Sequence, residues 1–147
     1  MELDSLYQEV ILDHYKHPQN KGLTSEFSAQ VHHVNTSCGD EITLNVTIKD
    51  RKISGISWDG QGCSISQASV SILSELLMDK TLEEAEVITQ SFSNLMASKG
   101  TSAGDPEVLE DAVAFAGVSK FPSRVKCALL GWMAFKDAAV QSQGEMK

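Results

Sequence analysis

Three cysteines and one aspartate are the residues of this sequence best suited to metal or sulfur chemistry. Cys38 and Asp40 lie two residues apart in the stretch SCGDEITLNV, Cys63 ends the stretch DGQGC, and Cys127 ends the stretch FPSRVKC. Thiolate sulfur favours zinc or iron–sulfur clusters over magnesium and calcium. Three thiolates and one carboxylate would complete a tetrahedral zinc site. Because a carboxylate is the harder and more exchangeable ligand, such a site suits a metal centre from which one ligand can leave.

The spacing of these residues leaves other interpretations open. There is no CxxC pair, and three cysteines, an odd number, argue against a disulfide framework. Three separately buried cysteines also fit the spacing, because free cysteine is among the most buried residue types. Cys63 precedes a predicted helix, whose N-terminus would favour a reactive thiolate. It could equally be a small residue at a crowded turn made by Gly60 and Gly62.

The four histidines are weaker candidates, because no recognised zinc spacing includes them. His32 and His33 are adjacent on a predicted strand and point to opposite faces, so at most one of them would face a shared site. His14 and His17, on or just after the first helix, are expected to be surface or capping residues. The serines of residues 64–74 are expected on an exposed helix face.

A small sheet must position the first two candidate ligands. Ile42, Leu44, Val46 and Ile48 alternate with polar residues, which predicts a strand directly after Asp40. Strands are also predicted at 28–35 and 53–58, with Gly55 as a bulge in the latter. An antiparallel meander places the start of its second strand beside the end of its third. Cys38 and Asp40 are therefore expected near Cys63.

Helices follow the strands and must deliver the remaining candidate, Cys127. Thr81 with Glu84 is the signature of a capping box, and Asp105-Pro106 is a cap-then-proline helix start. Apolar periodicity predicts helices at 3–16, 64–78, about 82–97, 105–117 and from Pro122 onward. This order predicts an α+β fold, a three-stranded antiparallel sheet with helices packed mainly on one face. Residues 1–147 are expected to form one domain, with a polar, frayed tail at about 141–147.

Composition excludes several classes of protein. Twelve Lys and Arg against twenty Asp and Glu give a net charge of −8, which argues against nucleic acid as a partner. No apolar run approaches the ~20 residues that cross a bilayer, so no membrane association is expected. The start MELDSLYQEVILDHY lacks the features of a secretory signal. These observations predict a cytoplasmic protein.

Four stretches resemble the iron–sulfur cluster assembly proteins of the IscU/NifU type: LYQEVILDHYKHPQNKG, CGDEITLNV, GQGCSISQASVSIL and FPSRVKCALLGW. The resemblance runs from about residue 4 to residue 137 and includes all three cysteines and the aspartate of CGD. The SufU branch of this family is favoured by two features. The LPPVK segment and the histidine before the last cysteine, both typical of scaffold proteins, are missing, and Lys126 replaces the histidine. An extra stretch, SNLMASKGTSAGDPEVLEDA, separates the second and third cysteines.

The resemblance implies a zinc-dependent sulfurtransferase with one zinc ion per chain, held by Cys38, Asp40, Cys63 and Cys127. It implies that Cys38 accepts persulfide sulfur from a cysteine desulfurase of the SufS type, which feeds the SufBCD complex. A histidine of the desulfurase would replace one cysteine on the zinc, and Asp40 would tune the site. Arg124, one helical turn before Cys127, either steadies the persulfide or the partner or is a solvated charge. The alternative is an IscU-type scaffold that carries a [2Fe–2S] cluster.

Overall fold

A three-stranded sheet and a set of helices make up the fold. The structure, a computed structural model, describes residues 5–37 and 39–145. Strands β1, β2 and β3 pair antiparallel in the order β1-β2-β3, which confirms the predicted α+β class and meander. The elements in chain order are α1 (Ser5–Lys16), β1 (Ala29–Asn35), β2 (Asp40–Lys49), β3 (Lys52–Gln61), α2 (Ser64–Leu76), α3 (Leu82–Ala97), α4 (Pro106–Leu109), the 3-10 helix η1 (Glu110–Lys120) and α5 (Pro122–Glu145).

The turn and the bulge of the β2–β3 hairpin follow from the local sequence. Asp50 and Arg51 connect the strands with positive φ angles of 54° and 62°, the backbone of a type I′ hairpin turn. Thr47 pairs with Gly55, whereas Ile48 pairs with Ile53. The intervening residue 54 is therefore the extra residue of a bulge, next to the glycine where the bulge was predicted.

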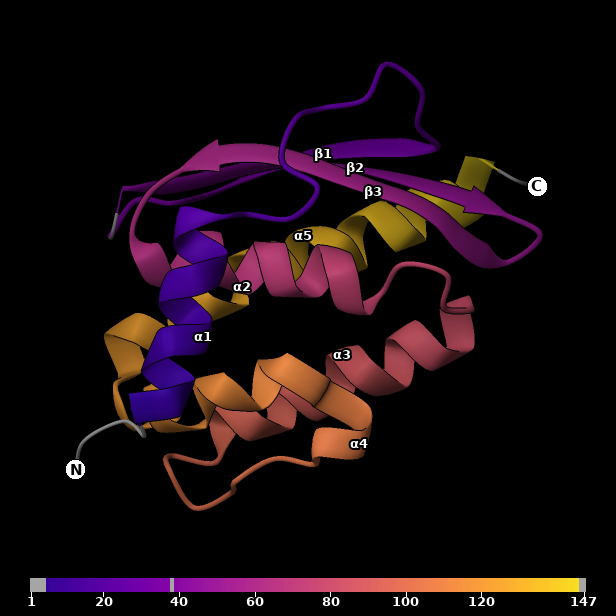
Figure 1. Cartoon of the computed structure of the whole chain (residues 1–147). Coiled ribbons are helices and arrows are strands. Elements are labelled where there is room, and N and C mark those ends of the chain that lie inside the picture. Colours follow the sequence, from indigo (N-terminus) through magenta and orange to yellow (C-terminus); the bar gives the residue numbers. More distant parts are fainter. Residues whose placement is uncertain (1–4, 38, 146–147) are drawn as a thin grey trace.

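The helices pack mainly on one face of the sheet, as predicted, in two layers (Figure 1). α5 runs beneath β1 and β2, and α2 lies beside it under the sheet, with α1 crossing α2. α3, α4 and η1 form the layer beyond. Phe92 of α3 stacks on Trp132 of α5 with ring centroids 4.3 Å apart and meets Phe115 of η1 edge-on. These aromatic contacts join the outer layer to α5. Of the helices described, none is both long and apolar enough to cross a bilayer.

The serines of α2 are buried, so the prediction of an exposed serine face is wrong. Ser66, Ser69, Ser71 and Ser74 are all buried, because α2 lies between α1, α5 and the sheet. Hydroxyl groups tolerate this position when each has a hydrogen-bond partner. The Ser69 hydroxyl donates to the Ala128 carbonyl at 2.6 Å, and the Ser74 hydroxyl donates to the Ser71 carbonyl at 2.7 Å. The apolar spacing predicted this helix correctly, but it did not predict that the polar face would also be buried.

His14 is also buried, with 6 % exposure, so its prediction as a surface or capping residue is wrong. Its Nδ1 lies 2.8 Å from the Ser71 hydroxyl, whose oxygen also accepts the Gln19 amide N–H at 2.8 Å. Nε2 faces Asp111 at 3.7 Å and Glu75 at 4.0 Å. These three residues offer metal-binding atoms within 4.8 Å of one another, and their contacts join α1, α2 and η1.

Both predicted caps are confirmed, whereas two helix ends differ from the prediction. Thr81 and Glu84 form the full capping box of α3, and Asp105 caps α4. The helical segment that was predicted to end near residue 117 continues as η1 to Lys120. The predicted frayed tail from residue 141 is helical as far as Glu145. Polar residues dominate this last turn, so periodicity gives no sign of it.

Candidate metal centre

Asp40, Cys63 and Cys127 converge at one end of the sheet. Asp40 is the first residue of β2, Cys63 caps the N-terminus of α2 directly after β3, and Cys127 lies in the second turn of α5. Each offers one ligand atom, and these atoms all lie within 4.8 Å of one another. The meander therefore brings Asp40 and Cys63 together as expected, and α5 delivers Cys127. Cys38, two residues before Asp40, lies outside the described residues.

The Asp40 carboxylate is fixed by the backbone of the β3–α2 turn. Asp40 is completely buried, and its Oδ1 accepts the Cys63 amide N–H at 2.8 Å. Its Oδ2 lies 3.7 Å from the Cys63 sulfur. Gly62 has a φ of +147°, and a Cβ built at this position would lie 2.1 Å from Asp40 Oδ1 and 2.9 Å from its Cα. Only glycine lets this turn approach the aspartate so closely.

Replacement of Gly62 by alanine is expected to displace the Asp40 carboxylate and to disturb the whole centre. The clash involves a backbone atom as well as the carboxylate, and the backbone φ adds strain of about 1–3 kcal/mol. We expect a loss of unfolding free energy of that size and a zinc affinity reduced by about tenfold or more. Chemical denaturation and chelator competition measure both quantities. Gly55→Ala is the matched control, because a Cβ there meets only Thr47 at 3.6 Å. Equal effects of the two substitutions would contradict the prediction.

The packing of α5 on α2 determines where Cys127 lies. The buried Ser69 of α2 bonds to the Ala128 carbonyl, next to Cys127, and accepts the Trp132 indole N–H at 3.0 Å. At Gly131 the two helices approach so closely that an added Cβ would lie 2.9 Å from Val70 Cβ. These contacts fix both the position of α5 along α2 and the distance between the two helices. Since α2 begins at the Cys63 cap, the same packing sets the separation of the two sulfurs.

Asn35 is a polar contact of the centre that sequence reasoning missed. It is the last residue of β1 and pairs across the sheet with Asp40. Its Nδ2 lies 3.9 Å from the Cys127 sulfur, and its Oδ1 accepts the Ser37 amide N–H at 3.2 Å. An asparagine at a strand end has no sequence signature for such a role. Only the register of β1 on β2 and the position of α5 place it here.

The donor set fits zinc. On a tetrahedral zinc ion with bonds of 2.0–2.3 Å, neighbouring ligand atoms lie about 3.3–3.8 Å apart. The 3.7 Å between Asp40 Oδ2 and the Cys63 sulfur already matches this spacing. The ligand atoms of the three described donors are at most 4.8 Å apart, so small shifts would bring them to this spacing. A completely buried carboxylate beside two thiols is also the kind of group that a cation compensates. Cys38 stays the predicted fourth donor.

The histidines do not join this group. His33 Nε2 bonds to Asp137 of α5 at 3.0 Å, and this bond, with a second from Gln141, holds the pKa of the Asp137 carboxyl below its usual value. His32 lies 3.8 Å from Glu41. The two side chains leave opposite faces of β1, as predicted, but neither belongs to the cluster of candidate ligands. Arg124, in the first turn of α5, is exposed.

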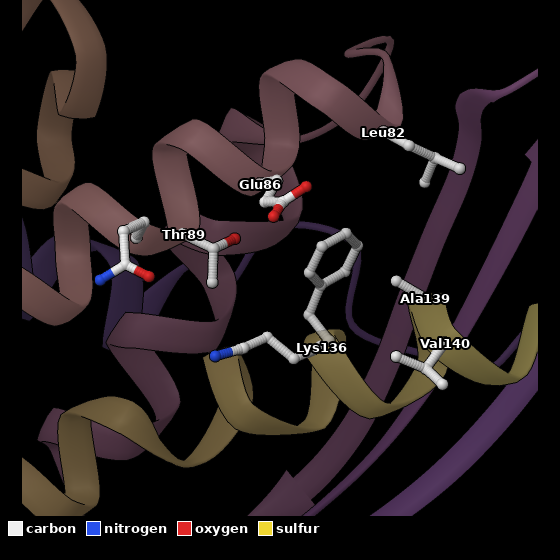
Figure 2. A pocket seen from close by; sticks show the side chains of 8 residues that line it. Leu82, Glu86, Thr89, Lys136, Ala139 and Val140 are labelled. Carbon is white, nitrogen blue, oxygen red and sulfur yellow. The ribbon is translucent and has the colours of Figure 1, made fainter. Parts of the chain in front are cut away.

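The centre is separate from the hollow between α3 and α5. That hollow has a volume of about 310 Å³, and Figure 2 shows side chains of both helices around it. Leu82, Ala139 and Val140 gather at one side of the hollow, and Glu86 and Lys136 lie toward the other (Figure 2). Asp40, Cys63 and Cys127 take no part in its lining. The candidate ligands therefore meet where strand ends and helix N-termini come together rather than in this hollow.

Comparison with known proteins identifies the family. Residues 6–128 match the family model described as the NifU-like N terminal domain. The chain belongs to this family. It is 39% identical over 142 residues to the zinc-dependent sulfurtransferase SufU of Bacillus subtilis, covering 97% of this chain and 95% of that protein. It is 38% identical over 141 residues to the iron–sulfur cluster assembly scaffold protein IscU of Streptococcus pyogenes serotype M1, covering 96% and 87%.

A solved structure supports the assignment to the NifU-like N-terminal domains. The crystal structure described as a putative iron–sulfur cluster assembly scaffold protein for the SUF system, from Fervidobacterium islandicum AW-1, superposes with a TM-score of 0.82 at 34% identity. The match covers 91% of this chain and 96% of that one. The resemblance to SufU and to the IscU/NifU type is therefore confirmed. NifU-like N-terminal domains with names from both branches are similar to this chain.

Proposed function

We propose that this protein is a cytoplasmic, zinc-dependent sulfurtransferase that accepts persulfide sulfur from a cysteine desulfurase of the SufS type. The sulfur would pass to the SufBCD complex for iron–sulfur cluster assembly. The observation that carries the proposal is the convergence of Asp40, Cys63 and Cys127, with ligand atoms within 4.8 Å of one another. The 39% identity to a protein named zinc-dependent sulfurtransferase supports the same function.

The proposed reaction is an exchange between sulfur atoms without net oxidation. The Cys38 thiolate attacks the outer sulfur of the desulfurase persulfide, which has the form R–S–SH. A new sulfur–sulfur bond forms on Cys38 while the old one breaks, and the donor cysteine leaves as a thiolate. The proton stays with the transferred sulfur. The product is a persulfide on Cys38 and a regenerated thiolate on the desulfurase.

The residues of the centre divide the work in this proposal. Cys63 and Cys127 hold the metal. The buried Asp40 is the carboxylate ligand that tunes the site, and the hydrogen bond from the Cys63 amide N–H holds it in place. A bound zinc ion keeps its thiol ligands deprotonated near neutral pH and shields them from side reactions. Cys38 is the cysteine proposed to leave the ligand set and act as acceptor. Arg124, exposed in the first turn of α5, is proposed to steady the persulfide or the partner.

Alanine release by the desulfurase tests the function directly. Each turnover releases one alanine from cysteine and leaves a persulfide on the desulfurase. The desulfurase can turn over again only after an acceptor has removed this sulfur. We expect zinc-loaded protein to accelerate alanine release well beyond the rate of the desulfurase alone. No acceleration by the zinc-loaded wild-type protein would remove sulfur transfer as the function.

An IscU-type scaffold for a [2Fe–2S] cluster is the second candidate, favoured by the 38% identity to a protein named as such a scaffold. Lys126 stands directly before Cys127, where the scaffold branch carries a histidine, and this counts against stable cluster binding. Reconstitution with iron and sulfide separates the two functions. A scaffold develops a stable visible chromophore, whereas the proposed sulfurtransferase keeps its zinc and stays colourless.

Replacement of Asp40 by alanine is expected to leave zinc bound, because three thiolates remain, but to slow sulfur transfer by about tenfold or more. It also removes the acceptor of the Cys63 N–H, which costs about 1–3 kcal/mol of unfolding free energy. Zinc content, thermal denaturation and alanine release check the three parts. Asp13→Ala, which removes an exposed carboxylate from α1, is the control. A variant at residue 40 that lost its metal would show that the carboxylate is indispensable for zinc binding.

A further inference from the structure

The Asn35 side chain links two parts of the candidate centre. Its Nδ2 lies 3.9 Å from the sulfur of Cys127, which is 3 % exposed, and its Oδ1 accepts the Ser37 amide N–H at 3.2 Å. Ser37 directly precedes Cys38 in the sequence. One amide group thus contacts a sulfur on α5 and the backbone of the segment that leads to the proposed acceptor.

The hydrogen-bond pattern fixes which end of the amide faces the sulfur. A backbone N–H can only donate, so the atom next to the Ser37 nitrogen must be the amide oxygen. The NH₂ group then points to Cys127. At its own backbone, Asn35 pairs with Asp40 in the sheet, which holds the side chain at the edge of the centre.

An N–H donor has a defined effect on a thiolate. It stabilises negative charge on the sulfur, withdraws electron density from it and fixes its direction. Among the described residues, the Cys63 sulfur has a different environment, beside the Asp40 carboxylate at 3.7 Å. The two sulfurs are therefore chemically unequal, and Cys127 is both the buried one and the one that faces an amide N–H donor.

We propose that Asn35 is a positioning residue that keeps Cys127 as a permanent metal ligand and holds the segment before Cys38 against the centre. This inference rests on the proposed function, in which Cys38 leaves the ligand set and Cys127 does not. Through its Oδ1, Asn35 fixes the position of the Ser37 backbone, which leads to Cys38. Through its NH₂ group it fixes the direction of the Cys127 sulfur. A single side chain thereby separates the ligand that stays from the residue that moves.

Two substitutions separate the two bonds. Asn35→Asp keeps an oxygen for the Ser37 N–H but removes the donor to sulfur, whereas Asn35→Leu removes both at similar size. The readouts are zinc affinity by chelator competition and the sulfur-to-metal charge-transfer band of the cobalt-substituted protein. Asn94→Asp and Asn94→Leu are matched controls on the exposed face of α3, where Asn94 Oδ1 also accepts a hydrogen bond.

We expect the charge-transfer band to move to lower energy in both residue-35 variants, because the sulfur loses its N–H donor. Zinc affinity should fall by about tenfold or more in Asn35→Leu and by less in Asn35→Asp. A wild-type band in both variants would overturn the bond to Cys127, and with it the proposal. Because neither readout uses the desulfurase, a failure of sulfur transfer in the wild-type protein would be recognised separately.

Discussion

Replacement of Cys38 by alanine is expected to abolish the acceleration of alanine release while the protein stays folded. Removal of a nucleophile costs orders of magnitude in rate, so the stimulated rate should fall by roughly 100-fold or more, to that of the desulfurase alone. Asp40, Cys63 and Cys127 remain as three donors within 4.8 Å of one another, so zinc binding should weaken rather than vanish. Alanine release, zinc content and circular dichroism on the same sample check the three parts.

Ser37→Ala is the matched control for this prediction. Residue 37 is the exposed neighbour of Cys38, and its backbone N–H, which bonds to Asn35, survives the substitution. This variant should stimulate the desulfurase like the wild-type protein. A Cys38→Ala protein that is folded, holds zinc and still accelerates turnover would exclude Cys38 as the acceptor, and attention would move to Cys63, the half-buried thiol at the α2 N-terminus.

Removal of the proposed zinc ion with a strong chelator is expected to lower the melting temperature markedly without unfolding the protein at room temperature. A ligand at 1,000 times its Kd adds about 4.1 kcal/mol to the unfolding free energy. At roughly 2–4 °C per kcal/mol for a chain of this size, the melting temperature should fall by about 8–16 °C. The fold should persist, because the sheet, α2, α3 and α5 share one apolar core in which most of the side chains are aliphatic or aromatic. Differential scanning calorimetry with and without chelator measures the change.

The same experiment tests the view that the metal merely staples the fold. In that case the metal-free protein would lose its secondary structure, as small zinc domains do. Cys63→Ser serves as the control, because a protein with a weakened ligand set should show a smaller fall in melting temperature on chelation than the wild-type protein. Complete unfolding of the metal-free wild-type protein would contradict this prediction. It would show that the metal holds the fold together.

The sequence by itself determined the elements and the candidate ligands. Alternation from Ile42 to Ile48 defines β2, and local signals such as the Thr81–Glu84 capping box place a helix start to the residue. These features depend on neighbours within a few positions, so they can be read along the chain. The antiparallel meander, which follows from short connections, was enough to place Asp40 beside Cys63.

Only the tertiary structure decided how the helices surround the centre. Burial of the α2 serines and of His14 depends on how many elements pack around α2, and a local pattern contains no such information. The position of Cys127 depends on the Ser69–Ala128 bond and on the close approach at Gly131, between segments about sixty residues apart. Asn35 meets the Cys127 sulfur for the same reason. Such contacts depend on how complete helices and strands pack. A contact between two distant segments can form only when the surfaces of both elements are in place, so neither segment's local sequence predicts it.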